Sequence, residues 1–108
     1  MTDIEKFERI NSLLLSYGDL LSQSQKDVLS CYYSFNLSIS EIAEERNVSR
    51  AAIEDALKKG EKKLEEYEAV LKNNEKREQI LKITAKLKEN SEISKDIEEI
   101  ERILIDGI

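Results

Sequence analysis

The sequence predicts an all-α protein without strands, in which a head of short helices is followed by long C-terminal helices. Its 108 residues include no Pro and only three Gly, so little in the chain interrupts a helix. Charged residues make up 37% and alternate in sign, which is typical of solvated helix faces. Apolar residues recur at steps of three and four, the spacing of amphipathic helices. The length suits a single compact domain with a helical appendage.

The first helix is expected over residues 2–17. Thr2 is followed three residues later by Glu5, the spacing of a capping box. The predicted inward stripe consists of Ile4, Phe7, Ile10, Leu14 and Tyr17. Gly18 follows directly and is expected to end the helix in the left-handed conformation.

A second helix should begin after Ser22, because Gln25 again stands three residues on. Its predicted inner face is formed by Val28, Leu29, Tyr32 and Tyr33, and residues 35–37 end it. The single thiol, Cys31, lies within this stretch. The sequence has neither a second Cys nor a His to pair with it, so Cys31 is interpreted as a small helix residue beside the core.

A third capping box, Ser38 with Glu41, opens a helix that should end near Arg46. The apolar side of that helix is predicted to carry Ile39, Ile42 and Ala43. Three capping boxes within forty residues are hard to obtain by chance, and they support the helical assignment of this whole region.

A tight turn is expected directly after this helix. Asn47 tolerates the left-handed conformation, Val48 would act as an apolar plug, and Ser49 would cap the next helix. Helix, tight turn and capped helix together form the helix-turn-helix layout. We expect Ile42, Val48 and Ile53 to hold the bend by packing inward.

The helix that follows should run to about residue 73 along a heptad-like seam of Ile53, Leu57, Gly60, Leu64, Tyr67 and Leu71. Asn73 and Asn74 then supply a C-cap or bend. Helices are expected over residues 76–89 and, after a turn at 90–94, through the isoleucine-rich end of the chain. We therefore divide the chain into a helix-turn-helix domain with its N-terminal helix, residues 1–72, and a C-terminal helical extension, residues 73–108.

The seam and the isoleucine-rich tail also favour a homodimer, since amphipathic helices need a surface on which to bury their apolar stripe. The tail stripe comprises Ile93, Ile97, Ile100, Ile103 and Leu104. The alternative is that these helices fold back on the head of the same chain.

The composition argues against catalysis, metal binding and cofactor binding. The chain has no His, one Cys and no glycine-rich phosphate loop, so we expect no enzyme, no metal and no cofactor. The N-terminal sequence lacks the pattern of a signal peptide, and no apolar run approaches the ~20 residues that span a bilayer. We expect a cytoplasmic protein with no membrane partner.

Candidate nucleic-acid contacts lie in the second helix of the helix-turn-helix, because that helix enters the major groove in proteins of this class. They are Ser49, Arg50, Lys58, Lys59 and Lys62. Arg50 could contact guanine or phosphate, and Ser49 could donate to a phosphate at the helix N-terminus. Residues 49–63 hold five basic and three acidic residues, a local excess of positive charge in a chain whose net charge is −6.

A second interpretation stays open. Ser49 would then serve only as a cap, the lysines would only solvate a face, and the unit would be a protein-docking module. Ala51 and Ala52 offer no hydrogen bonds to a base, and Glu54 and Asp55 repel phosphate. Sequence-specific recognition by this helix would therefore be weak.

Residues 20–68 resemble region four of bacterial sigma factors. The matching segments are Ser24–Leu29, Tyr32-Tyr33, Ser40–Glu45 and Asn47–Arg50. More closely, the stretch from Thr2 to about Leu71 resembles the YlxM family, small helix-turn-helix proteins encoded beside signal recognition particle genes in low-GC Gram-positive bacteria.

This resemblance implies a DNA-binding or regulatory protein acting in the signal recognition particle pathway. Its expected partners are DNA, the RNA of the particle and the particle's proteins, and it implies no enzyme. Ala51 and Glu54 stand where the family commonly has a Gln and an aromatic residue. The alternative function is a module that binds proteins of the particle without sequence-specific DNA recognition.

Overall fold

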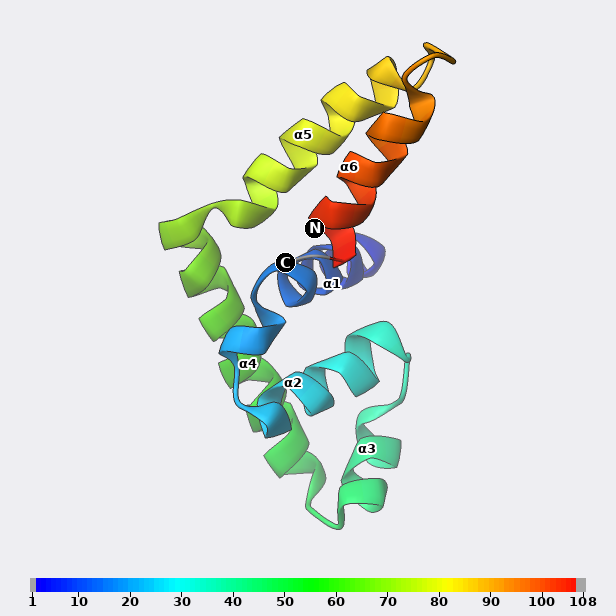
Figure 1. Cartoon of the computed structure of the whole chain (residues 1–108). Coiled ribbons are helices and arrows are strands. Elements are labelled where there is room, and N and C mark those ends of the chain that lie inside the picture. The colour runs from blue at the N-terminus through cyan, green and yellow to red at the C-terminus, as the bar shows by residue number, and fades with distance from the viewer. Residues whose placement is uncertain (1, 107–108) are drawn as a thin grey trace.

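The computed structural model describes residues 2–106, which form six α-helices and no strand (Figure 1). The helices are α1 (Asp3–Tyr17), α2 (Gln23–Leu29), α3 (Ile39–Arg46), α4 (Arg50–Leu71), α5 (Asn73–Leu87) and α6 (Ser94–Asp106). A 3-10 turn, η1 (Gly18–Leu20), follows α1, and a π-helical segment, η2 (Ser30–Ser34), extends α2. The prediction of an all-α fold is confirmed.

The core of the molecule lies where α1, α2 and α3 pack against α4. Twelve buried side chains form it: Ile10, Leu13, Tyr17, Leu21, Val28, Leu29, Tyr33, Ile42, Ala43, Ile53, Leu57 and Leu64. Phe7, Tyr32 and Tyr33 form a cluster of aromatic rings at the edge of this core, with centroid separations of 4.8–5.4 Å. The core therefore lies wholly between residues 10 and 64.

The first helix begins and ends as predicted, but Gly18 after it does not have the predicted conformation. The Thr2 side chain accepts a hydrogen bond from the Glu5 amide at 3.2 Å. Ile4, however, is 73% exposed, because it lies in the first turn, before the part of α1 that the head covers, while Leu13 is fully buried. Gly18 has φ −54° and ψ −37°, so it is right-handed and not the left-handed stop expected. The chain continues from it into η1.

The bend between α3 and α4 has the predicted form. Both halves of the Ser38 capping box are present, Asn47 is left-handed with φ 55° and ψ 48°, and Ser49 accepts from the Ala52 amide at 3.1 Å. Ile42 and Ile53 are buried. The expectation that Val48 packs inward is wrong, since it is 45% exposed. The Val48 N–H donates to the Ala43 carbonyl at 3.0 Å, so residue 48 closes the turn through its backbone.

The seam along α4 follows the prediction as far as Tyr67, which is partly buried against the core, and then departs from it. Leu71 is 43% exposed, and Glu68, which is not part of the predicted seam, is buried. The helix ends at Lys72, which is left-handed at φ 53°, and α5 begins directly at Asn73. The helix boundary near residue 73 is confirmed, although a Lys and not an Asn adopts the left-handed conformation.

The two C-terminal helices form a hairpin at the end of the molecule opposite α3 (Figure 1). The first turns of α5 pack on α1 and on the end of α4, and the rest of α5 packs on α6. The molecule is elongated, 55 × 27 × 27 Å. Because the hairpin lies at the far end, it leaves α3 and the start of α4 open. None of the described helices is long and apolar enough to cross a membrane.

Candidate nucleic-acid interface

The five candidate residues all lie at or beyond the bend, on or beside the exposed surface of α4. Ser49 is the N-cap, and its Oγ accepts the Ala52 amide, which leaves its hydroxyl hydrogen free to donate to a phosphate. The side chains of Arg50, Lys58 and Lys62 are exposed. None of these three forms a hydrogen bond or ion pair with another side chain in residues 2–106.

Arg50, Glu54, Lys58 and Lys62 form one row along α4, because residues four apart are neighbours on a helix surface. The row extends about 18 Å from the bend toward the middle of the helix, at 1.5 Å per residue. It carries three positive charges, with Glu54 as the one negative charge between them. We call these four residues the α4 row.

Two of the nearby acidic side chains are already paired within the head. Lys59 Nζ lies 2.9 Å from Asp55 Oδ2, and Lys6 Nζ from α1 lies 3.1 Å from Glu61 Oε1. The Tyr33 hydroxyl also donates to Glu61. Burial and this hydrogen bond raise the pKa of Tyr33 above its ordinary value. Lys59 is consequently bound to its neighbour, unlike the three basic residues of the α4 row.

The exposed surface of α3 is mainly negative, in contrast to the positive α4 row. Glu41, Glu44 and Glu45 are exposed there, and Arg46 at the end of the helix donates to Ser24 Oγ at 3.1 Å. Residues 38–63 as a whole contain six basic and six acidic residues. Five of these six basic residues lie on α4, while α3 carries three Glu and one Arg and would repel phosphate.

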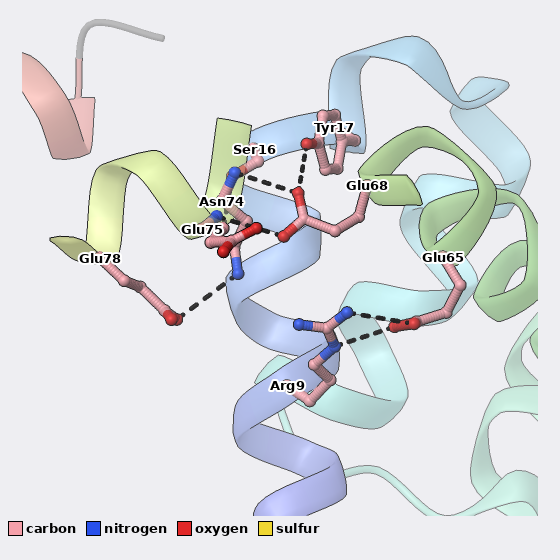
Figure 2. A network of polar contacts seen from close by, with 8 residues as sticks. All are labelled: Arg9, Ser16, Tyr17, Glu65, Glu68, Asn74, Glu75 and Glu78. Carbon is pink, nitrogen blue, oxygen red and sulfur yellow. Dashed lines mark hydrogen bonds and ion pairs between the residues drawn. The ribbon is translucent and has the colours of Figure 1, made fainter. Parts of the chain in front are cut away.

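A buried polar cluster at the junction of α1, α4 and α5 was not predicted from the sequence (Figure 2). The Tyr17 hydroxyl donates to Glu68 Oε1 at 2.5 Å and accepts from the Asn73 amide at 2.8 Å. The two carboxylate oxygens of Glu68 accept the amides of Asn74 and Glu75, each at 3.2 Å. The free N–H groups of the first turn of α5 are thus satisfied by side chains of α1 and α4.

Arg77 completes the cluster from α5. Its guanidinium donates to Ser16 Oγ at 2.7 Å, to the Ser12 carbonyl at 3.0 Å and to Asn74 Oδ1. Burial lowers the pKa of Arg77 and raises that of Tyr17. Nearby, Arg9 on α1 makes a two-pronged contact with Glu65 on α4, which raises the pKa of Arg9 (Figure 2).

These contacts give the cluster a structural role. Both oxygens of Glu68 accept hydrogen bonds, two of them from amides of the first turn of α5, so this carboxylate caps the helix. The only hint in the sequence is an acidic residue, Glu68, directly after the seam residue Tyr67. That hint becomes interpretable only once Tyr17, 51 residues away in sequence, lies opposite it.

Comparison with known families matches residues 4–103 to the family UPF0122, described as "Putative helix-turn-helix protein, YlxM / p13 like". The chain belongs to this family. UPF0122 proteins of Bacillus cereus (strain AH187), Bacillus anthracis (strain A0248) and Bacillus thuringiensis subsp. konkukian (strain 97-27) are each 40% identical to it over 108 residues. Each match covers 93% of this chain and 98% of the relative.

UPF0122 membership agrees with the resemblance inferred from the motifs, and it extends beyond them. The match runs through α5 and most of α6, whereas the motifs cover the chain only to about Leu71. The C-terminal hairpin is therefore part of the UPF0122 pattern and not an addition to the head.

Proposed function

We propose that this UPF0122 protein binds nucleic acid through the α4 row, with Arg50, Lys58 and Lys62 contacting phosphates and the Ser49 hydroxyl assisting at the helix N-terminus. The single observation that carries the proposal is that these three cations are exposed and unpaired among the described residues, while Asp55 and Glu61 beside them are neutralised within the head. Lys59 contributes by pairing with Asp55, which offsets the charge of that carboxylate beside the α4 row.

The proposed contacts are to the backbone more than to base edges. Ala51 and Ala52, in the first turn of α4, cannot hydrogen-bond to a base. Glu54 interrupts the α4 row and repels phosphate. Affinity then depends mainly on charge and falls as the salt concentration rises, because the release of counterions from the nucleic acid on binding becomes less favourable. A regulatory role in the signal recognition particle pathway, with DNA or the particle's RNA as the target, follows from the family resemblance.

The test is a salt series of binding to duplex DNA and to signal recognition particle RNA. The double variant Lys58→Ala, Lys62→Ala should weaken binding and reduce the slope of log affinity against log salt by about 2, one phosphate contact for each Lys. Glu54→Gln should strengthen binding. Lys95→Ala, an exposed Lys on α6, is the matched control and should change neither quantity. Absence of binding to both nucleic acids at low salt contradicts the proposal.

A second candidate function, a protein-docking module, is favoured by the acidic surface of α3. In helix-turn-helix complexes the first helix crosses the phosphate backbone, where Glu44 and Glu45 would be repelled. A basic surface on a protein of the signal recognition particle would complement them. Pull-down with the particle's GTPase and with its receptor tests this function. Glu44→Lys with Glu45→Lys should abolish capture, and capture that is unaffected by this reversal argues against α3 as the docking surface.

A further inference from the structure

The α5–α6 hairpin has an apolar face that nothing else in residues 2–106 covers. Ile80, Ile83 and Leu87 on α5, with Ile100 and Ile103 on α6, are 41–60% exposed. We call these five residues the hairpin face. The buried side chains of the hairpin itself are few, notably Thr84 and Ile97, and neither belongs to the main core.

The five residues lie on one side of the hairpin. The line of contact between the helices is fixed by Thr84, whose Oγ1 donates to Glu101 Oε2 at 2.7 Å, and by the ion pair of Lys88 with Glu101. At 100° per residue, the three exposed residues of α5 are turned by about 40–100° from Thr84, all to the same side. Because α6 runs antiparallel to α5 (Figure 1), its exposed residues on the corresponding side face the same way.

We infer that the hairpin face is the interface of a homodimer in which two hairpins form an antiparallel four-helix bundle. The partner is a second copy of this chain, because the hairpin face and the charges beside it are complementary to themselves under a two-fold rotation. A two-fold axis parallel to the helices lays α5 of each copy over α6 of the other. Lys86 lies on the outer edge of α5 and Glu99 on the outer edge of α6, and both are exposed. That rotation brings each Lys86 beside the partner's Glu99, as flanking charges pair in coiled coils.

The composition of the surface supports a second copy as the partner. The hairpin face is apolar, with each side chain 41–60% exposed, and polar residues flank it. A stable interface of about 800 Å² per partner likewise has a little over half of its area non-polar. Two amphipathic helices on their own bury too little apolar surface to be stable. In a four-helix bundle the apolar faces of all four helices are buried in a common core.

Light scattering and sedimentation of the full chain test the dimer. We expect twice the 12.5 kDa chain mass at high protein concentration. Ile83→Lys and Ile103→Lys should each weaken dimerisation about 100-fold or more by placing an unpaired charge in the interface. Both side chains are exposed in the single chain, so helical content should not change. Ala85→Lys, on the opposite side of α5, is the matched control and should leave the dimer intact.

Exchanging the charges of Lys86 and Glu99 distinguishes a homodimer from binding of a different protein to the hairpin face. Lys86→Glu and Glu99→Lys should each weaken the dimer, and the double variant should restore it, because within one chain these residues lie on opposite edges of the hairpin. A single chain mass at all concentrations, or no effect of Ile83→Lys, overturns the inference. Nucleic-acid binding by the α4 row does not depend on this result, since the two surfaces lie at opposite ends of the molecule.

Discussion

Leu29 on α2 lies directly against the backbone of α4 at Gly60. A Cβ at residue 60 would stand 2.6 Å from Leu29 Cδ1 and 3.1 Å from Leu29 Cγ. Leu29 is fully buried, so it has no free space into which to turn. The absence of a side chain at residue 60 therefore sets how closely α2 approaches the long helix on which the head is built.

Gly60→Ala should destabilise the protein despite the higher helix propensity of Ala. The propensity gain is about 1 kcal/mol, and the overpacking against Leu29 costs about 1–3 kcal/mol, so a net loss of up to about 2 kcal/mol is expected. Urea denaturation measures the loss. Gly18→Ala is the control, because Gly18 is right-handed and its Cβ would only touch Lys26 Cε at 3.5 Å. Equal or greater stability of Gly60→Ala would show that α2 and α4 are not in close contact.

Asn47 supplies the left-handed residue of the bend, and its replacement tests the turn. Asn47→Ala should cost about 1 kcal/mol of unfolding free energy, because a Cβ without a compensating polar group is strained in this conformation. Asn47→Gly should be neutral or stabilising. The comparison is made by thermal and urea unfolding. If Ala and Gly have the same effect, residue 47 is not left-handed in solution.

Tyr17→Phe should loosen the junction between the head and the hairpin. Removing the hydroxyl leaves the Asn73 amide without its acceptor and Glu68 Oε1 with one donor fewer, at a cost of about 1–3 kcal/mol. Hydrogen exchange at the Asn73 amide should accelerate. Tyr67→Phe is the matched control, since the Tyr67 hydroxyl makes only a long contact of 3.4 Å to the Leu20 carbonyl. Unchanged exchange at Asn73 would contradict this role.

Alkaline pH should destabilise the fold through Tyr17 and Tyr33. Burial, with the hydrogen bonds to Glu68 and Glu61, raises the pKa of both phenols. The unfolded chain loses these protons near pH ~10, while the folded chain retains them. Their contribution to stability is therefore complete below pH ~10 and lost as the pH rises above it. Phenolate absorbance and urea midpoints across this range measure the effect. Titration of all four tyrosines near pH ~10 with a constant midpoint would refute it.

Features set by local chemistry could be predicted from the sequence. The capping box at Ser38, the left-handed Asn47 and the Ser49 cap depend on residues within a few positions of one another, and all are present. Features that depend on which other helices pack over a residue could not be predicted from the sequence. Periodicity placed Ile4 and Leu71 inward, and the turn motif placed Val48 inward, yet these three side chains are 43–73% exposed. A Gly directly after the apolar stripe predicted a left-handed stop at residue 18; the helix does end there, but Gly18 is right-handed because the chain continues into a 3-10 turn.

The candidate site divides in the same way. The position of Ser49, Arg50, Lys58, Lys59 and Lys62 along one helix followed from the helix-turn-helix motif, and their contact with nucleic acid stays a prediction. The pairing of Lys6 with Glu61 was not predictable, because it joins residues 55 positions apart through the packing of α1 on α4. The Tyr17–Glu68 cluster was missed for the same reason.

Chemical-shift mapping of the isotope-labelled full chain with duplex DNA at low salt tests the proposed interface most directly. The largest perturbations should fall on residues 49–62, with the amides of Ser49 and Arg50 prominent, and they should fade as salt is added. Perturbations confined to α5 and α6, or a spectrum that does not change at any DNA concentration, would contradict the role assigned to α4.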